Sequence, residues 1–297
     1  MKKKKILCVC MSATYQRTVV FEKLLTAKVN RAEHYNLYAS GKAVNAARVI
    51  SQLQKDSVIT VCPLGKQNST EFIKLAQQDG LGLYSIETPG KIRECWTLLD
   101  TRKKTTTELV VGEPVPEEDF SSCEIKLLRL ITDKLEECEA LLLAGSRQGK
   151  WSPDIYAVIC GIALDKGKTV LADFIGSELL AALKTAVPSI IKINDDEFKA
   201  TFKLEANEQN ICKKSREFNN IIIVTRGSDS TLAAERGTFY ECPSQKVEVV
   251  NTTACGDSFN AGFLYEYLKT KDMNKALEKG TWCAAMNARS EAPGSIV

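Results

Sequence analysis

The residues best suited to chemistry lie in the stretch 251–263, which reads Asn-Thr-Thr-Ala-Cys-Gly-Asp-Ser-Phe-Asn-Ala-Gly-Phe. Partial alternation of apolar and polar residues predicts a strand over 246–250, and apolar residues at helical spacing predict a helix over 259–268. Small residues between a strand and a helix let the backbone approach a ligand, and the free N–H groups at the helix start face an anion. Asp257 stands at that start, where a carboxylate either caps the helix or takes part in a reaction.

A second cluster suited to an anion begins at Gly41 and Lys42. Alanine, isoleucine and leucine residues at helical offsets within 43–53 predict one buried helix face directly after this pair. The pair therefore forms another helix start, now with a side-chain cation, and Arg93 adds a two-pronged donor elsewhere in the chain. Taken alone, such cations are more often solvated surface residues than phosphate ligands.

Several classes of enzyme are made unlikely by what the sequence lacks. The chain has 297 residues and a single histidine, His34, and none of its 11 cysteines forms a Cys-x-x-Cys pair, which argues against structural zinc and Ser-His-Asp catalysis. No Rossmann glycine turn follows the first predicted strand at 6–11. The run 145–150 has one residue too few for a P-loop, and Trp151 stands where its hydroxyl residue belongs.

Charge and hydropathy predict a cytosolic protein that binds neither nucleic acid nor membrane. The net charge is +3, and much of it comes from four lysines at positions 2–5, which we expect to be a solvated terminus. No apolar stretch is long enough for a signal peptide or a membrane span. The scattered cysteines are expected to be reduced and mostly buried.

The predicted elements that must position these residues form one α/β domain over 1–297. From about residue 124 onward, apolar strands alternate with amphipathic helices, which indicates a doubly wound, mostly parallel sheet with helices on both faces. The more polar segment 14–38 and a predicted hairpin within 93–112 do not fit that sheet. We expect them to form a small β-sheet that acts as a lid.

The stretch 251–263 resembles the second signature of the ribokinase-like (PfkB) sugar kinases, Asp/Asn-Thr-x-Gly-Ala-Gly-Asp-x-Phe-x-Ala-Gly-Phe. Residues 40–49 resemble the Gly-Gly-Lys-Gly-x-Asn-x-Ala-Arg element of the branch that phosphorylates hexose phosphates, which includes 1-phosphofructokinase and tagatose-6-phosphate kinase. Shorter pieces follow in the family's order and spacing: Ile92-Arg93, Gly145-Ser146, Asp173 with Gly176, Lys192 with Asn194 and Glu197, and Thr225-Arg226-Gly227.

The resemblance implies an ATP- and Mg²⁺-dependent kinase and assigns a role to each matching residue. It makes Asp257 the general base, and the N–H groups of Ala254, Cys255 and Gly256 an anion hole for the transferring phosphoryl group. For the sugar or sugar phosphate it implies Gln16, Gly41, Lys42, Asn45 and Arg93. For ATP it implies Lys192, Asn194, Thr225, Gly227 and, near the adenine, Asn287. Asn194 and Glu197 would organise Mg²⁺ through water, although an Asn-x-x-Glu sequence is as often a helix cap.

Departures from the family pattern fall mostly on the expected sugar side. Gln16 stands where the branch usually has an aspartate, and Ala254 and Cys255 replace a Gly and an Ala. The favoured substrate is a hexose phosphate of the fructose 1-phosphate or tagatose 6-phosphate type. The alternatives are a catalytically altered nucleotide- or sugar-binding homologue, and a kinase for another small metabolite. A homodimer formed through the lid is expected, because the edges of a small sheet benefit from cover.

Overall fold

The structure is a computed structural model, and it describes residues 5–112, 116–147 and 150–297. Of the predicted lysine-rich start only Lys5 lies within these ranges, and the P-loop-like run 145–150 lies partly outside them.

The described residues form one large sheet whose strand order reverses at the first strand, β1. The order is β13-β12-β11-β10-β9-β8-β1-β4-β5, and every neighbouring pair is parallel except β11 with β12 and β12 with β13. The strands are β1 Lys5–Cys10, β4 Val58–Gly65, β5 Leu83–Thr88, β8 Cys138–Ala144, β9 Thr169–Asp173, β10 Ile190–Asn194, β11 Ile221–Thr225, β12 Thr231–Glu235 and β13 Thr238–Cys242.

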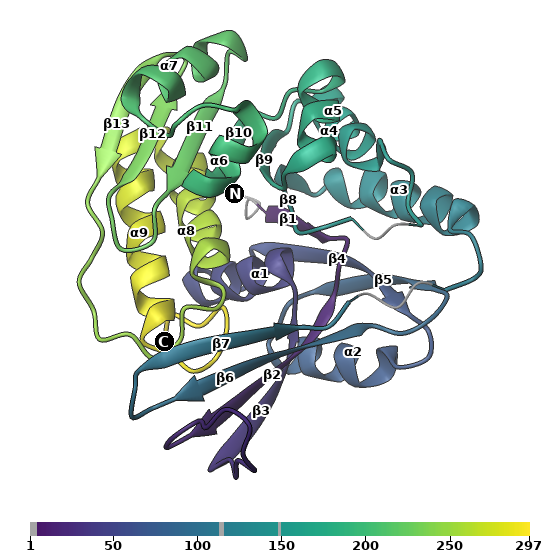
Figure 1. Ribbon diagram of the computed structural model, residues 1–297. Coiled ribbons are helices and arrows are strands. Elements are labelled where there is room, and N and C mark those ends of the chain that lie inside the picture. The colour runs from purple at the N-terminus through teal and green to yellow at the C-terminus, as the bar shows by residue number, and fades with distance from the viewer. Residues whose placement is uncertain (1–4, 113–115, 148–149) are drawn as a thin grey trace.

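Helices cover both faces of this sheet, as the alternating sequence pattern predicts (Figure 1). Side chains alternate along β1, so that Ile6, Cys8 and Cys10 face one core while Leu7 and Val9 face the other. The first core is closed by α1 Lys42–Leu53, α2 Ser69–Gln78, α8 Cys255–Thr270 and α9 Met273–Ala288. The second is closed by α3 Ser121–Leu135, α4 Ile155–Asp165, α5 Gly176–Thr185, α6 Asp195–Phe202 and α7 Glu208–Glu217.

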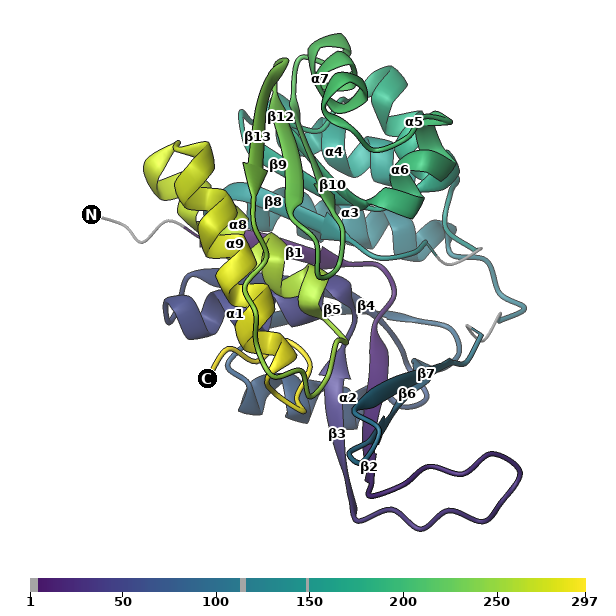
Figure 2. The same cartoon turned by 60° about the vertical axis from the view of Figure 1, so that its left-hand side comes forward.

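Four further strands form a separate small sheet in the order β3-β2-β6-β7. They are β2 Thr14–Phe21, β3 His34–Ser40, β6 Arg93–Asp100 and β7 Thr105–Val110. The pairs β2–β3 and β6–β7 are antiparallel, whereas β2 and β6 run parallel. The small sheet projects from the edge of the large one near the start of α8 (Figures 1 and 2).

Three predicted elements differ from the structure. The expected strand at 246–250 is wrong: the segment is mostly exposed, pairs with no strand among the described residues and runs along α9 (Figure 2). Helix α8 begins at Cys255, four residues before the predicted start, and α3 begins at Ser121, three residues before residue 124, where the alternating pattern was expected to begin. The edge hairpin of β12 and β13 was not predicted, because its short strands lack a strong periodic pattern. No helix in the described part of the chain is long and apolar enough to cross a membrane.

Candidate active site

The carboxyl ends of the central strands bring the predicted residues together. Strands β9, β10 and β11 end at Asp173, Asn194 and Thr225, and β1 ends at Cys10. Ligands of open α/β sheets bind at this edge, where the strand order reverses. The N-termini of α1 and α8 lie at this edge, because Lys42 at the start of α1 bonds to Asp173 and Asn45 bonds to Asp257 in the first turn of α8.

The start of α8 is a compact anion-facing turn. Ala254, the N-cap, has a φ of 67°, the left-handed region that glycine adopts most easily. A Cβ added to Gly256 would lie 2.8 Å from Nζ of Lys192, so the buried Lys192 ammonium sits directly beside the turn. Free helix N–H groups and a lysine therefore converge on one point, which suits a phosphoryl group.

Asp257 is buried in the first turn of α8, with 6% of its surface exposed. Nδ2 of Asn45 donates a hydrogen bond of 2.9 Å to its Oδ2. Burial raises the pKa of Asp257 to about 6, the negative charge of Asp173 raises it as well, and the positive charges of Lys42 and Lys192 oppose the shift. A carboxylate with a pKa near 6 is ionised at neutral pH and is still basic enough to accept a proton.

Asp173 joins the two lysines of the site. Its Oδ1 accepts a bond of 2.7 Å from Nζ of Lys42, and its Oδ2 accepts bonds of 3.2 Å from Lys192 and 2.6 Å from Nδ2 of Asn260. Burial opposes ionisation of Asp173, but Lys192 and Lys42 more than compensate and hold its pKa well below the usual range. In turn, Asp173 raises the pKa of Lys42, so this lysine remains charged beside Asp257.

The predicted sugar-side residues lie at the base of the small sheet. Arg93 begins β6 and donates 2.9 Å from Nε to Oγ1 of Thr14, its partner across β2. Gly41 lies so close to β1 that a Cβ would meet Sγ of Cys10 at 2.6 Å. Arg93 and Lys42 therefore come from different elements and have different partners, Thr14 and Asp173.

Gln16 is buried in β2, and its amide hydrogens are engaged within the small sheet. Nε2 donates to Oγ1 of Thr97 at 2.8 Å and to the carbonyl of Cys95 at 3.3 Å. The Thr97 hydroxyl lies 3.2 Å from Oγ1 of Thr253, which donates to Oε1 of Glu108 at 2.6 Å. This chain of hydrogen bonds ties the small sheet to the loop that precedes α8.

On the nucleotide side, Asn194 and Glu197 form a capping box at the start of α6. The Asn194 side chain accepts from the Glu197 amide at 2.7 Å, and Glu197 accepts from the Asn194 amide at 2.8 Å. Thr225 pairs with Asn194 across β10 and β11, and Gly227 has a φ of 59° with nothing within 4 Å of the position of a Cβ. That space could admit a ligand.

Asn287 lies beneath the loop before α8. Nδ2 donates to the Thr253 carbonyl at 2.8 Å and contacts Sγ of Cys255 at 3.4 Å, while Oδ1 accepts from the Gly294 amide at 2.7 Å. These bonds make Asn287 a support for the turn, a role that the sequence pattern did not indicate. Burial raises the pKa of Cys255, which keeps its thiol protonated, and its backbone N–H donates to the Thr252 carbonyl at 3.3 Å.

Sequence reasoning assigned no role to Asp173, Thr97 or Thr253. A carboxylate directly after a buried strand was the available signal for Asp173. The two threonines carried no such signal, because their contact joins positions 156 residues apart.

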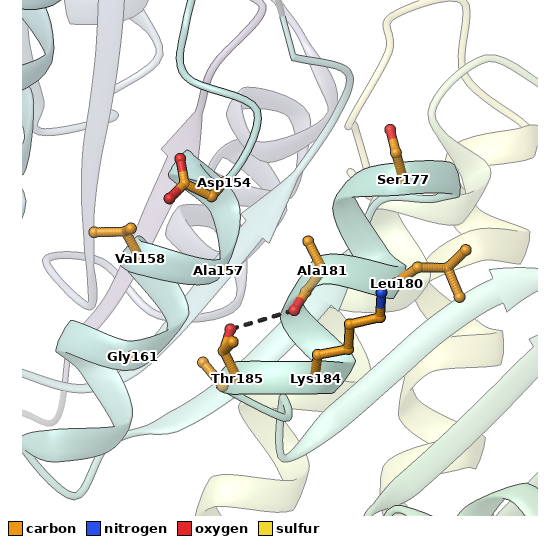
Figure 3. Close-up of a pocket in the computed structure, with 10 residues that line it drawn as sticks. Asp154, Ala157, Val158, Gly161, Ser177, Leu180, Ala181, Lys184 and Thr185 are labelled. Carbon is orange, nitrogen blue, oxygen red and sulfur yellow. Dashed lines mark hydrogen bonds between the residues drawn. The ribbon is translucent and has the colours of Figure 1, made fainter.

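No described group of three His, Cys, Asp or Glu residues could hold a metal ion. A separate groove of about 660 Å³ lies between α4 and α5 (Figure 3). It is lined mainly by apolar and small side chains such as Val158 and Leu180, with Asp154 and Lys184 nearby. It contains none of the residues predicted for the site.

The fold and site define an α/β protein with a buried carboxylate and two lysines at the N-terminus of a helix. Residues 5–296 match the model of the pfkB family carbohydrate kinases. A 1-phosphofructokinase of Vibrio cholerae is 26% identical over 289 residues, which cover 95% of this chain and 89% of that protein. The chain belongs to the pfkB family of carbohydrate kinases.

Solved structures share the fold at low sequence identity. One described as a possible 1-phosphofructokinase of Thermotoga maritima has a TM-score of 0.85 at 16% identity, covering 97% of this chain and 93% of the other. Phosphofructokinase-2 of Escherichia coli in complex with fructose-6-phosphate has a TM-score of 0.81 at 15% identity, covering 96% and 93%. The ribokinase-like fold expected from the sequence is confirmed.

Proposed function

We propose that this kinase transfers the γ-phosphoryl group of Mg²⁺-bound ATP to a hydroxyl of a hexose phosphate, of the fructose 1-phosphate or tagatose 6-phosphate type. The observation that carries this proposal is the Asp257 carboxylate, buried at the start of α8 and held by Asn45 next to two lysines. The names of the Vibrio cholerae and Thermotoga maritima relatives support the choice of substrate.

Asp257 acts as the general base. Asn45 occupies Oδ2, and no side chain among the described residues donates a hydrogen bond to Oδ1, which is then available to the proton of the acceptor hydroxyl. As that proton moves to Asp257, the hydroxyl oxygen forms a bond to the γ-phosphorus and the bond to the ADP oxygen breaks. Positioning and charge stabilisation supply most of the rate enhancement in such a transfer.

The transferring group is stabilised by the turn 254–256 and by Lys192. Backbone N–H groups of Ala254, Cys255 and Gly256 are the donors, and the Lys192 ammonium beside Gly256 adds a full charge. The Cys255 N–H donates to the Thr252 carbonyl at 3.3 Å and would turn from it to the phosphoryl group. The bond from Lys192 to Asp173 keeps this cation in place when no phosphate is bound.

The acceptor is held by Gly41, Lys42, Asn45 and Arg93, with Gln16 nearby in β2. Lys42 and Arg93 supply the charges for the phosphate that the acceptor already carries. Because both hydrogens of the Gln16 amide are used within the small sheet, Gln16 would meet a sugar hydroxyl only as an acceptor, through its carbonyl oxygen.

ATP lies over Lys192, Asn194, Thr225 and Gly227. Glu197 would hold Mg²⁺ through water, and this fits a cation that keeps most of its waters and takes few protein ligands. Its carboxylate is close enough to Lys42 to raise the pKa of that lysine, so the charge of Glu197 reaches the site. When bound, the ion neutralises charge on the phosphates of ATP.

The test is ADP production by the purified protein with Mg²⁺ and ATP across a panel of fructose 1-phosphate, fructose 6-phosphate, tagatose 6-phosphate, unphosphorylated sugars and nucleosides. We expect one hexose phosphate to give the highest kcat/KM, with an acidic limb near pH 6 set by Asp257. Asp257→Asn should lower kcat by about 10²–10⁴-fold while ATP still binds. Turnover equal to that of the wild type would refute the assignment.

Asp272→Asn is a matched control, because Asp272 caps α9 and an asparagine caps equally well. The alternative of a catalytically altered homologue is favoured by the engaged amide of Gln16 and by Ala254, and it predicts ATP binding without transfer to any member of the panel. A nucleoside as best substrate would point instead to a kinase for another metabolite.

The compartment and the assembly of the enzyme belong to the same proposal. The 11 free thiols suit a reducing compartment, and we place the enzyme in the cytosol. We place a homodimer contact on the small sheet, because this sheet carries exposed apolar side chains such as Trp96 and Leu109.

A further inference from the structure

Arg48 is a buried guanidinium one helical turn from Asn45, with 6% of its surface exposed. Nε and Nη2 donate to Oδ2 of Asp79 at 2.9 and 2.8 Å, and Nη2 also donates to the Ala39 carbonyl. Nη1 donates to the Pro293 carbonyl at 2.9 Å and to Oδ1 of Asn45 at 3.2 Å. All five N–H donors of the guanidinium therefore have acceptors, and the group has one orientation.

Asn45 receives two donors on one side of its amide. Its Oδ1 accepts from Arg48 and from Oγ of Ser40, the latter at 2.9 Å. An amide held by its oxygen in this way must point its NH₂ group in the opposite direction, and there Nδ2 meets Oδ2 of Asp257. With the amide reversed, two oxygens would face each other beside Asp257.

We propose that Arg48 is a positioning residue of the catalytic site, which acts through Asn45 to hold one oxygen of the Asp257 carboxylate and so to keep this base ionised and aimed at the acceptor. The inference rests on the proposed role of Asp257 as the base. The guanidinium itself contacts neither that carboxylate nor, among the described residues, any group assigned to ATP.

The environment of the two groups separates this role from a direct charge effect. Asp257 faces Lys42 from α1, Asp173 from β9 and Lys192 from β10, and these account for the electrostatic influences on its pKa, together with the hydrogen bond from Asn45. Arg48 faces Asp79, which neutralises it, and lies close enough to lower the pKa of Tyr38 against the opposing effects of burial and Glu291.

The C-terminal segment is part of the same arrangement. The Pro293 carbonyl accepts a hydrogen bond from Arg48, and a Cβ on Gly294 would come within 2.7 Å of the Asn45 carbonyl. Asn45 is thus clamped from three sides: by Arg48, by Ser40 and by the backbone at 293–294. A residue that merely bound sugar would not need this support.

The test is the pH dependence of kcat/KM in Arg48→Met. Without Arg48, Ser40 alone donates to Oδ1 of Asn45. The bond from Asn45 to Asp257 then weakens, and the acidic limb set by Asp257 should move to higher pH by about one unit. Ser40→Ala removes only the second donor and should give a smaller shift in the same direction, which keeps the proposal testable if Arg48→Met folds poorly. In an Asn45→Ala background, Arg48→Met should cause no further shift.

Ser215→Ala is the control for lost stability alone. Its buried hydroxyl bonds to the Asn220 and Ala234 carbonyls in the layer of α7, so it should lower Tm without moving the limb. The proposal would be overturned if the acidic limb of kcat/KM shifted in neither Arg48→Met nor Ser40→Ala. It would also be overturned if Arg48→Met shifted the limb equally in the wild-type and Asn45→Ala backgrounds.

A readout that needs no turnover separates this inference from the proposed function. The pKa of the Asp257 carboxyl, followed by ¹³C NMR in labelled protein, should rise in Arg48→Met whatever the substrate. A rise in a protein that phosphorylates nothing would preserve the positioning role and refute the kinase assignment. An active kinase in which Arg48→Met leaves the pKa of Asp257 unchanged would support the kinase assignment and refute the positioning role.

Discussion

At the scale of single residues, burial raises the proton affinity of the Asp257 carboxylate and disfavours its charge. Its pKa is about 6 in the folded protein against an ordinary 3.8. The folded protein therefore keeps a proton in this interval that the unfolded chain releases. Its stability must fall as the pH rises through the interval and stay lower above it.

Asp257→Asn should accordingly be more stable than the wild type at pH 8. The pKa difference corresponds to on the order of 3 kcal/mol at most, since part of it relaxes in a real protein. The advantage should disappear below about pH 4, where the carboxyl is protonated in both states. Urea unfolding at pH 4 and pH 8 measures this. If the stability difference between Asp257→Asn and the wild type were the same at pH 4 and pH 8, burial would not destabilise the charged form of Asp257.

Which residues carry the site was partly readable from the sequence. Asp257, Lys42 and Lys192 stood out because small residues and helix starts surround them or the family pattern includes them. Asp173 and Arg48 also match the family pattern, but the sequence did not show their roles, because these arise from partners 131 and 245 residues away in the chain. The residue type gave the possible chemistry, and only the tertiary structure gave the contact.

At the scale of elements, the start of α8 shows where sequence periodicity fails. The apolar pattern begins at Phe259, whereas the helix begins at Cys255, because the first turn is held by the loop and by Asn287 rather than by apolar packing. The wrongly predicted strand at 246–250 has a different cause. Its residues alternate only weakly, and the segment adds no strand to the large sheet, whose edge in the described residues is β13. The regular βα units were predicted well, because both faces of each strand are buried.

Removing a methyl group at position 254 should stabilise the protein, whereas adding one at position 256 should lower its activity. Ala254→Gly should stabilise the protein by up to about 1 kcal/mol, because glycine adopts a φ of 67° without strain. Turnover should be preserved, as only the backbone of residue 254 is used. Thermal unfolding and steady-state kinetics measure both effects.

Gly256→Ala is the counterpart. Its Cβ would come within 2.8 Å of Nζ of Lys192 and push this cation away from the transferring phosphoryl group. We expect a loss in kcat of about tenfold or more, with a smaller change in Tm. An active Gly256→Ala enzyme would mean that Lys192 takes no part in the transfer.

At the scale of the whole molecule, the small sheet has one face toward the site and one away from it. The register sets Gln16 beside Thr97 on the first face, where Thr97 meets the loop before α8. It sets Leu37, Arg17, Trp96 and Leu109 in a row across the second. Strand alternation makes this division unavoidable, so the small sheet also presents an outer surface.

That outer face carries exposed apolar side chains. Tyr35, Trp96 and Leu109 are 62%, 37% and 48% exposed, and the Arg17 guanidinium lies over the Trp96 ring at 5.4 Å. Contiguous exposed apolar side chains commonly mark interfaces. We expect this chain to form a homodimer through the outer faces of two small sheets.

Trp96→Glu should convert the dimer to a monomer, because it places a charge in the middle of the row. Light scattering coupled to size-exclusion chromatography measures the mass. Val158→Glu is the matched control: Val158 is 38% exposed in the groove between α4 and α5, away from the small sheet (Figure 3). If Val158→Glu rather than Trp96→Glu abolished association, the interface would lie in that groove. A wild-type monomer at micromolar concentration would exclude a stable dimer altogether.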